Sequence, residues 1–153
     1  MYLLHTNVIS ELRRPRPRHA VVRWVESQAA DRLFLSAVTI GEIQAGIEIT
    51  REQDAAKAEE IEAWLEKVLV SHSILPMDAA AFRAWARRKH RQSDTLIEDA
   101  MIAATAEVHG LTVVTRNAGD FRTLGVSVLD PFEPTLTTPA APAESPPAPT
   151  EPA

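Results

Sequence analysis

Residues 95–115 read TLIEDAMIAATAEVHGLTVVT, and this stretch decides the fold class. Its first four residues have the T-x-x-E pattern of a capping box, which predicts the start of a helix. The helix is apolar on almost every side over 100–106, so we expect it to be central and buried. Gly110 is suited to end it, and the apolar run 111–115 is predicted as a strand. A buried helix leading into an apolar strand is typical of an α/β domain.

The same alternation of strands and helices extends over the rest of the chain. The predicted strands are 2–4, 33–35, 74–77, 111–115 and 126–129, and the predicted helices include 8–13 and 20–29. Further helices are expected to start at two more capping boxes, beginning at Thr39 and Thr50, and behind Asp78. Because the strand runs are continuously apolar, we expect a parallel sheet covered by helices on both faces.

The composition of the 153 residues excludes several classes of protein. There is no cysteine, which rules out disulfide scaffolds and cysteine zinc sites, and the net charge is −5. No apolar run approaches about 20 residues and the N-terminus does not resemble a signal peptide, so we expect a cytoplasmic protein with no membrane span. Six of the eleven prolines lie after residue 134. The composition therefore predicts one folded domain over 1–133 and a disordered Pro/Ala-rich tail over 134–153.

Polar and acidic side chains follow the predicted strands. In an open parallel sheet, ligands bind beyond the carboxyl ends of the strands, so these side chains are expected to lie at one edge. Clustered carboxylates repel one another unless a cation joins them, and oxygen ligands suit Mg²⁺ or Mn²⁺. The residues that follow strands directly are His5, Thr6 and Asn7 after the first, and Asn117 and Asp120 after 111–115. Glu42 lies in the first turn of the helix after the second strand, and Asp99 lies in the first turn of the most apolar helix.

Each of these residues also has a purely structural explanation. Glu42 is the reciprocal member of the capping box that starts at Thr39, and this role alone would account for it. The positive end of the helix dipole would stabilise the negative charge of Asp99, which explains this residue structurally. Its position on the face of an apolar helix nevertheless favours a functional role. Asn117 and Asp120 would suit a turn.

Two clusters of basic residues lie at 13–19 and 87–91. A solvated surface explains such clusters most simply. They would also suit contact with the phosphates of RNA, or with an acidic partner peptide. The candidate contact residues are Arg13, Arg14, Arg87 and Arg88.

Four blocks of the sequence resemble the motifs of a known family. The blocks LLHTNVISEL (3–12), SAVTIGEIQAGI (36–47), IEDAMIAATA (97–106) and TVVTRNAGDF (112–121) resemble, in this order and spacing, those of PIN-domain ribonucleases. The chain is most similar to VapC-type toxins of type II toxin–antitoxin systems, over about residues 1–132.

The resemblance implies both a fold and a chemistry. It implies a three-layer α/β/α sandwich around a short parallel sheet, a homodimer, and Mg²⁺- or Mn²⁺-dependent endoribonuclease activity on RNA. It also implies a cognate VapB-like antitoxin that blocks the site with a peptide segment. Carried over residue by residue, it implies catalytic acids at Glu42, Asp99 and Asp120, metal positions at these three and His5, and supporting residues Thr6, Asn7, Thr115 and Asn117.

His5 departs from the family pattern, which has an aspartate at the end of the first strand. An imidazole supplies one nitrogen and no negative charge, so the affinity for Mg²⁺ should fall, whereas Mn²⁺ tolerates imidazole better. Two readings stay open. The chain is either a weakened ribonuclease, which we favour because Glu42, Asp99 and Asp120 are kept, or a catalytically silent PIN-like module that acts by binding a partner protein or RNA.

Overall fold

Five parallel strands form one sheet at the centre of the molecule. The computed structural model describes residues 1–90 and 96–133, so the expected tail over 134–153 lies outside the described residues. The strand order is β3-β2-β1-β4-β5, which places the first strand of the chain in the middle of the sheet. The strands are β1 (Tyr2–Leu4), β2 (Leu33–Ser36), β3 (Ser73–Leu75), β4 (Thr112–Val114) and β5 (Val128–Leu129). The predicted parallel sheet is confirmed.

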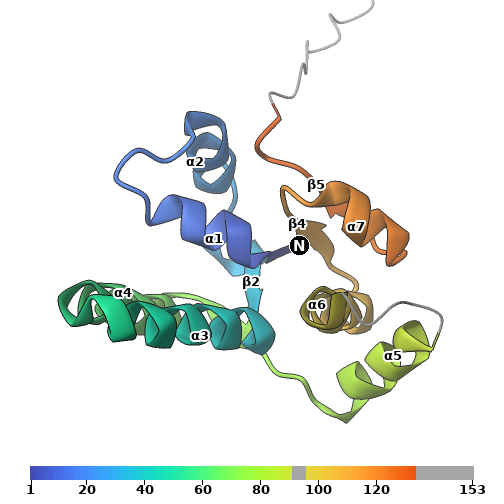
Figure 1. Cartoon of the computed structure of the whole chain (residues 1–153). Helices are drawn as coiled ribbons and strands as arrows, with labels where there is room; N and C mark the ends of the chain where they lie inside the picture. Colours follow the sequence, from blue (N-terminus) through green and yellow to red (C-terminus); the bar gives the residue numbers. More distant parts are fainter. Residues whose placement is uncertain (91–95, 134–153) are drawn as a thin grey trace, which may run out of the picture.

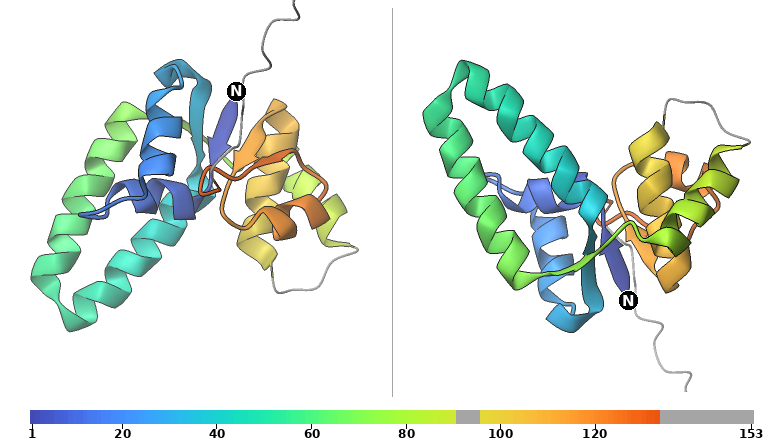
Figure 2. Two further views of the ribbon diagram at one scale, coloured as in Figure 1. Left: turned by 90° about the horizontal axis from the view of Figure 1, so that it is seen from above. Right: turned by 90° about the horizontal axis from the view of Figure 1, so that it is seen from below.

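Helices cover both faces of the sheet (Figures 1 and 2), so the expected three-layer α/β/α arrangement is confirmed. One side holds α1 (Thr6–Leu12), α2 (His19–Glu26), α3 (Ala37–Gln53) and α4 (Ala55–Ser71), and the other holds α5 (Ala79–Lys89), α6 (Ile97–His109) and α7 (Ala118–Thr123). A single 3₁₀ turn, η1 (Ala30–Arg32), precedes β2. In the part of the chain that the structure describes, no helix is both long enough and apolar enough to cross a bilayer.

The central strands divide their side chains between two hydrophobic cores. Leu4 and Val114 belong to the core beneath α1–α4, whereas Leu3 and Val113 belong to the core beneath α6 and α7. This division follows from the two-residue period of a strand, which sends successive side chains to opposite faces. The sheet is therefore buried on both sides, as the continuous apolar strands predict.

Helix α6 is the buried helix that the sequence predicts. Its residues Ala100, Ile102, Ala103 and Ala106 are at most 5% exposed and pack in the second core. Gly110 ends the helix in the left-handed conformation, with φ of 62°, where a residue with a β-carbon would be strained.

The two capping boxes predicted at Thr39 and Thr50 are wrong. α3 begins two residues before Thr39, at Ala37, because the hydroxyl of Ser36 accepts a hydrogen bond from the Val38 N–H at 3.1 Å. Thr50 lies inside α3, and α4 is capped instead by Asp54, whose carboxylate accepts from the Lys57 N–H at 3.0 Å. The T-x-x-E pattern recurs by chance inside helices, and a better-placed Ser or Asp took the capping role.

Three other helix ends bear on the predictions. Asp78 caps α5 as predicted, since its carboxylate accepts from the Ala81 N–H at 2.9 Å. The third predicted capping residue, Thr95, lies outside the described residues, and α6 has Leu96 as its N-cap. The short helix α7 was not predicted, because Asn117 and Asp120 suit a turn equally well.

We expect Asp54→Ala to lower the free energy of unfolding by about 1 kcal/mol, because it removes the cap of α4. Asp54→Asn is the matched control, since an asparagine caps a helix about as well as an aspartate. Chemical denaturation of the three chains measures the difference. Equal stability of the alanine variant and the parent would contradict the assignment of this cap.

Candidate functional site

The candidate site lies at the carboxyl edge of β1 and β4. The His5 N–H donates to the Val114 carbonyl at 2.9 Å, which continues the β1–β4 pairing past the end of β1. The site takes Asp99 from the first turn of α6 and Glu42 from the second turn of α3, because α3 begins earlier than predicted. One ligand atom from each of His5, Glu42 and Asp99 lies within 4.8 Å of the other two.

The His5 ring is fixed on three sides. Its Nε2 lies 3.1 Å from Oδ1 of Asp99, and its Nδ1 lies 2.9 Å from the hydroxyl of Thr115. The ring of Phe121 packs edge-on against it, with the ring centroids 4.9 Å apart. His5 is 5% exposed, so the imidazole has little freedom to turn away from these partners.

Two threonines orient the Glu42 carboxylate. The hydroxyl of Thr6, at the start of α1, donates to Oε2 of Glu42. The hydroxyl of Thr39 is fully buried and lies 3.2 Å from that of Thr6. A hydroxyl that donates to a carboxylate oxygen fixes the direction of the carboxylate.

The supporting residues form a second set of contacts around Thr115. Its hydroxyl accepts from the Asn7 side-chain amide at 3.2 Å and from the backbone N–H of Asn117 at 3.0 Å. The side chain of Asn7 thus reaches the site, whereas Asn117 contributes its backbone. Thr6, Asn7, Thr115 and Asn117 all lie in or beside the site, as the resemblance implies.

Asp120 is not brought into the same group. It lies in the first turn of α7 and is exposed. Among the described residues, the group that could hold a metal ion consists of His5, Glu42 and Asp99. The structure thus joins three of the four expected metal positions.

The basic cluster after α1 lies near the site, but the charge of Arg14 has a structural partner, which Arg116 from outside the cluster shares. Arg14 pairs at 3.3 Å with Glu11, a carboxylate that is 3% exposed and also accepts from the backbone N–H of Arg18 at 2.8 Å. The guanidinium of Arg116, beside Thr115, lies 3.8 Å from the same carboxylate and 4.1 Å from the centroid of the Phe132 ring. This part of the cluster therefore holds the loop after α1 against the loop after β4.

Arg13 has a different environment. It lies over the ring of Trp64, 5.7 Å from the ring centroid. Both residues line a pocket of about 230 Å³ that also includes Thr6 and Glu42. A pocket with one cationic and one aromatic wall thus adjoins Glu42.

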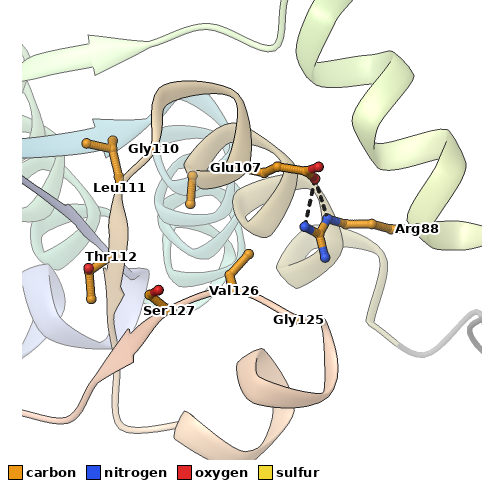
Figure 3. A pocket seen from close by; sticks show the side chains of 9 residues that line it. Arg88, Glu107, Gly110, Leu111, Thr112, Gly125, Val126 and Ser127 are labelled. Carbon is orange, nitrogen blue, oxygen red and sulfur yellow. Dashed lines mark hydrogen bonds and ion pairs between the residues drawn. The ribbon is translucent and has the colours of Figure 1, made fainter.

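The second basic cluster lies away from the site. Arg88 donates two hydrogen bonds to Glu107, at 2.9 and 2.7 Å, at the rim of a pocket of about 270 Å³ (Figure 3). That pocket includes Thr112 and Ser127, at the amino ends of β4 and β5, so it opens at the opposite edge of the sheet. Arg87 is exposed on α5.

The donor set fits a hard divalent cation in part. The carboxylates of Glu42 and Asp99 supply the oxygen ligands that Mg²⁺ and Mn²⁺ prefer, at a separation that one ion can bridge. The imidazole of His5 fits less well, because both of its ring nitrogens already have polar partners, Thr115 at Nδ1 and Asp99 at Nε2.

Two residues of the site were not predicted from the sequence. Thr39 was assigned to a helix cap, although its position three residues before Glu42 on one helix places both on the same face. Phe121, which packs against His5, ends the last motif block and was taken only as part of it. For Phe121 the sequence carries no signal beyond the motif.

Comparison with known proteins identifies the family. The family model of the PIN domain matches residues 2–126. The chain is 34% identical over 145 residues to VapC ribonuclease Y4jK of Sinorhizobium fredii, an alignment that covers 88% of this chain and 99% of the relative.

Two solved structures share the fold. The crystal structure of FitAcB from Neisseria gonorrhoeae matches with a TM-score of 0.77 and 35% identity, covering 86% of this chain and 99% of that chain. A toxin–antitoxin complex from Klebsiella pneumoniae matches with a TM-score of 0.66 and 25% identity, covering 87% and 99%. Together with the four motif blocks and the acids that the fold brings to one edge, these matches show that the chain belongs to the PIN-domain family.

Proposed function

We propose that this protein is a metal-dependent endoribonuclease toxin that hydrolyses RNA phosphodiesters, with an activity weakened by His5. The observation that carries the proposal is the convergence of Glu42 and Asp99, from two different helices, on one edge of the sheet. The similarity to a protein named as a VapC ribonuclease supports the reaction type.

The ion would be held by Glu42 and Asp99, and Mg²⁺ or Mn²⁺ suits their oxygen atoms. When bound, such an ion polarises the scissile phosphate and lowers the pKa of a water molecule that attacks it. The chain's own residues direct the two acids: Thr6 holds Oε2 of Glu42, and α6 presents Asp99 at its positive end. Asp120, the acid of the last motif, lies outside this group in the exposed first turn of α7, and its catalytic role is proposed from the family motif alone.

We also assign to this protein a VapB-like antitoxin as partner. The similarity to a toxin–antitoxin complex supports this assignment. The pocket lined by Arg13, Trp64 and Glu42 adjoins the site, so a peptide segment seated there would cover Glu42. Arg13 and the exposed Arg14 and Arg87 remain candidates for contact with RNA or antitoxin, and the homodimer remains a prediction.

A silent, partner-binding module is the second candidate function. The observation that favours it is the 3.1 Å contact between Nε2 of His5 and Oδ1 of Asp99, which occupies one oxygen of a proposed metal ligand. The experiments below separate the two candidates, because a silent module neither gains nor loses RNA cleavage when the acids change.

We expect His5→Asp to tighten Mg²⁺ binding and to raise the rate of RNA cleavage. An added carboxylate at the first position supplies a charge and a hard ligand, which should contribute about 1–3 kcal/mol, or roughly 5- to 150-fold. Calorimetric titration with Mg²⁺ and a cleavage assay on the same two proteins measure both effects. If the variant binds Mg²⁺ no better and cuts no faster, position 5 is not a metal position in this chain.

In the His5→Asp background, we expect Glu42→Gln or Asp99→Asn to reduce RNA cleavage by about 100-fold or more. Loss of residues that merely orient metal ligands costs roughly 10- to 100-fold, so loss of a ligand should cost at least as much. Glu48→Gln, at an exposed position of α3, is the matched control and should leave the rate unchanged. Undiminished cleavage in both acid variants would refute the proposed function.

A further inference from the structure

The orientation of the Asn7 amide is set by the backbone. The N–H of Arg116 donates to Oδ1 of Asn7 at 3.3 Å. A backbone N–H can only donate, so the atom that it contacts must be the amide oxygen. The other end of the amide is then the NH₂ group, and this group donates to the Thr115 hydroxyl at 3.2 Å.

The Thr115 hydroxyl consequently has one direction in which to donate. A hydroxyl carries one proton and two acceptor lone pairs. The Asn7 amide and the Asn117 backbone N–H, at 3.2 and 3.0 Å, are both donors and occupy the two lone pairs. The remaining partner of the fully buried hydroxyl is Nδ1 of His5 at 2.9 Å, which must therefore accept the proton.

An imidazole whose Nδ1 accepts a hydrogen bond carries its own proton on Nε2. The Nε2 of His5 lies 3.1 Å from Oδ1 of Asp99, so this carboxylate is the charged partner within reach of the Nε2 proton. The donor and acceptor of each hydrogen bond from the Arg116 N–H to His5 are therefore fixed, and they place the ring proton of His5 on the nitrogen next to Asp99.

We infer that His5 is a positioning residue that donates its Nε2 proton to Asp99, and that it is not a metal ligand. A metal ion at Nε2 would require the ring proton to move to Nδ1. The Thr115 oxygen would then face three donors with two lone pairs, and its own proton would lose its acceptor. The inference rests on the proposed function in one respect, namely that Glu42 and Asp99 hold the ion without position 5.

The tautomer can be measured without any metal. Two-bond ¹H–¹⁵N spectra of the full chain distinguish a pyridine-type nitrogen from a pyrrole-type nitrogen in each histidine ring, and His5→Gln assigns the signals. We expect a pyridine-type Nδ1 and a pyrrole-type Nε2, unchanged on addition of Mg²⁺. A pyrrole-type Nδ1, or a shift of the Nε2 signal with Mg²⁺, would overturn the inference.

A pair of variants tests the cause of the tautomer. Thr115→Ser keeps the hydroxyl and should keep the Nε2–H form, whereas Thr115→Val removes it and should give a mixture of both tautomers. If the valine variant folds and keeps the pure Nε2–H form, the Thr115 hydroxyl does not set the tautomer. If it does not fold, the serine variant and the parent spectrum still decide the tautomer itself.

Replacement of the ring gives a second, independent measurement. In His5→Gln the side-chain amide can donate to Asp99 from about the place of Nε2, but its nitrogen cannot bind a metal. Mn²⁺ titration, followed by the loss of the free-ion electron paramagnetic resonance signal, should give affinities within about threefold for the parent and the variant. A parent chain that binds Mn²⁺ more than about threefold tighter would show that the imidazole is a ligand. Undiminished RNA cleavage in the Glu42→Gln and Asp99→Asn variants would count against the proposed function alone, since the metal-free tautomer does not depend on it.

Discussion

The register between β1 and β4 determines where the site forms. These two strands lie side by side at the centre of the sheet, with Leu4 opposite Val114. Because they are parallel, the residues that follow them, His5 and Thr115, emerge at the same edge although 110 positions separate them in the sequence. The hydrogen bond from the His5 N–H to the Val114 carbonyl extends this pairing to the site itself.

The acids of the site are each supported from a different direction. Glu42 receives a hydrogen bond from Thr6 of the helix α1 that follows β1, and Asp99 lies 3.1 Å from the ring of His5 at the end of β1. The residues that contact the two acids, His5 and Thr6, are adjacent and directly follow β1. The end of this strand therefore positions both carboxylates. A backbone shift at the end of β1 would therefore change the direction of both acids together.

The sequence predicts the architecture well because the signals that matter there are local. Three local signals each fit one kind of secondary structure much better than any other. They are the continuous apolar strands, the all-round apolar character of 100–106 and the glycine at 110. Helix starts are harder, because Ser36 and Thr39 are both acceptable caps and only packing chooses between them. The structure brings Glu42 and Asp99 to one edge of the sheet, and their role there stays a prediction. The partners of His5 depend on Thr115 and Phe121, far away in the chain, and no local pattern reveals them.

The division of the interior into two cores has a consequence for the acids. Glu42 is carried by a helix that packs on one face of the sheet, and Asp99 by a helix that packs on the other. The thickness of the sheet, with its side-chain layers, therefore sets the gap between the two carboxylates. Methyl groups gained or lost in either layer, for example at Ile43 or Ile102, would widen or narrow that gap from a distance. Divalent cations differ in the ligand spacing that they accept. The packing of the interior would therefore influence which ion the two carboxylates bind, although these core residues would not contact the ion itself.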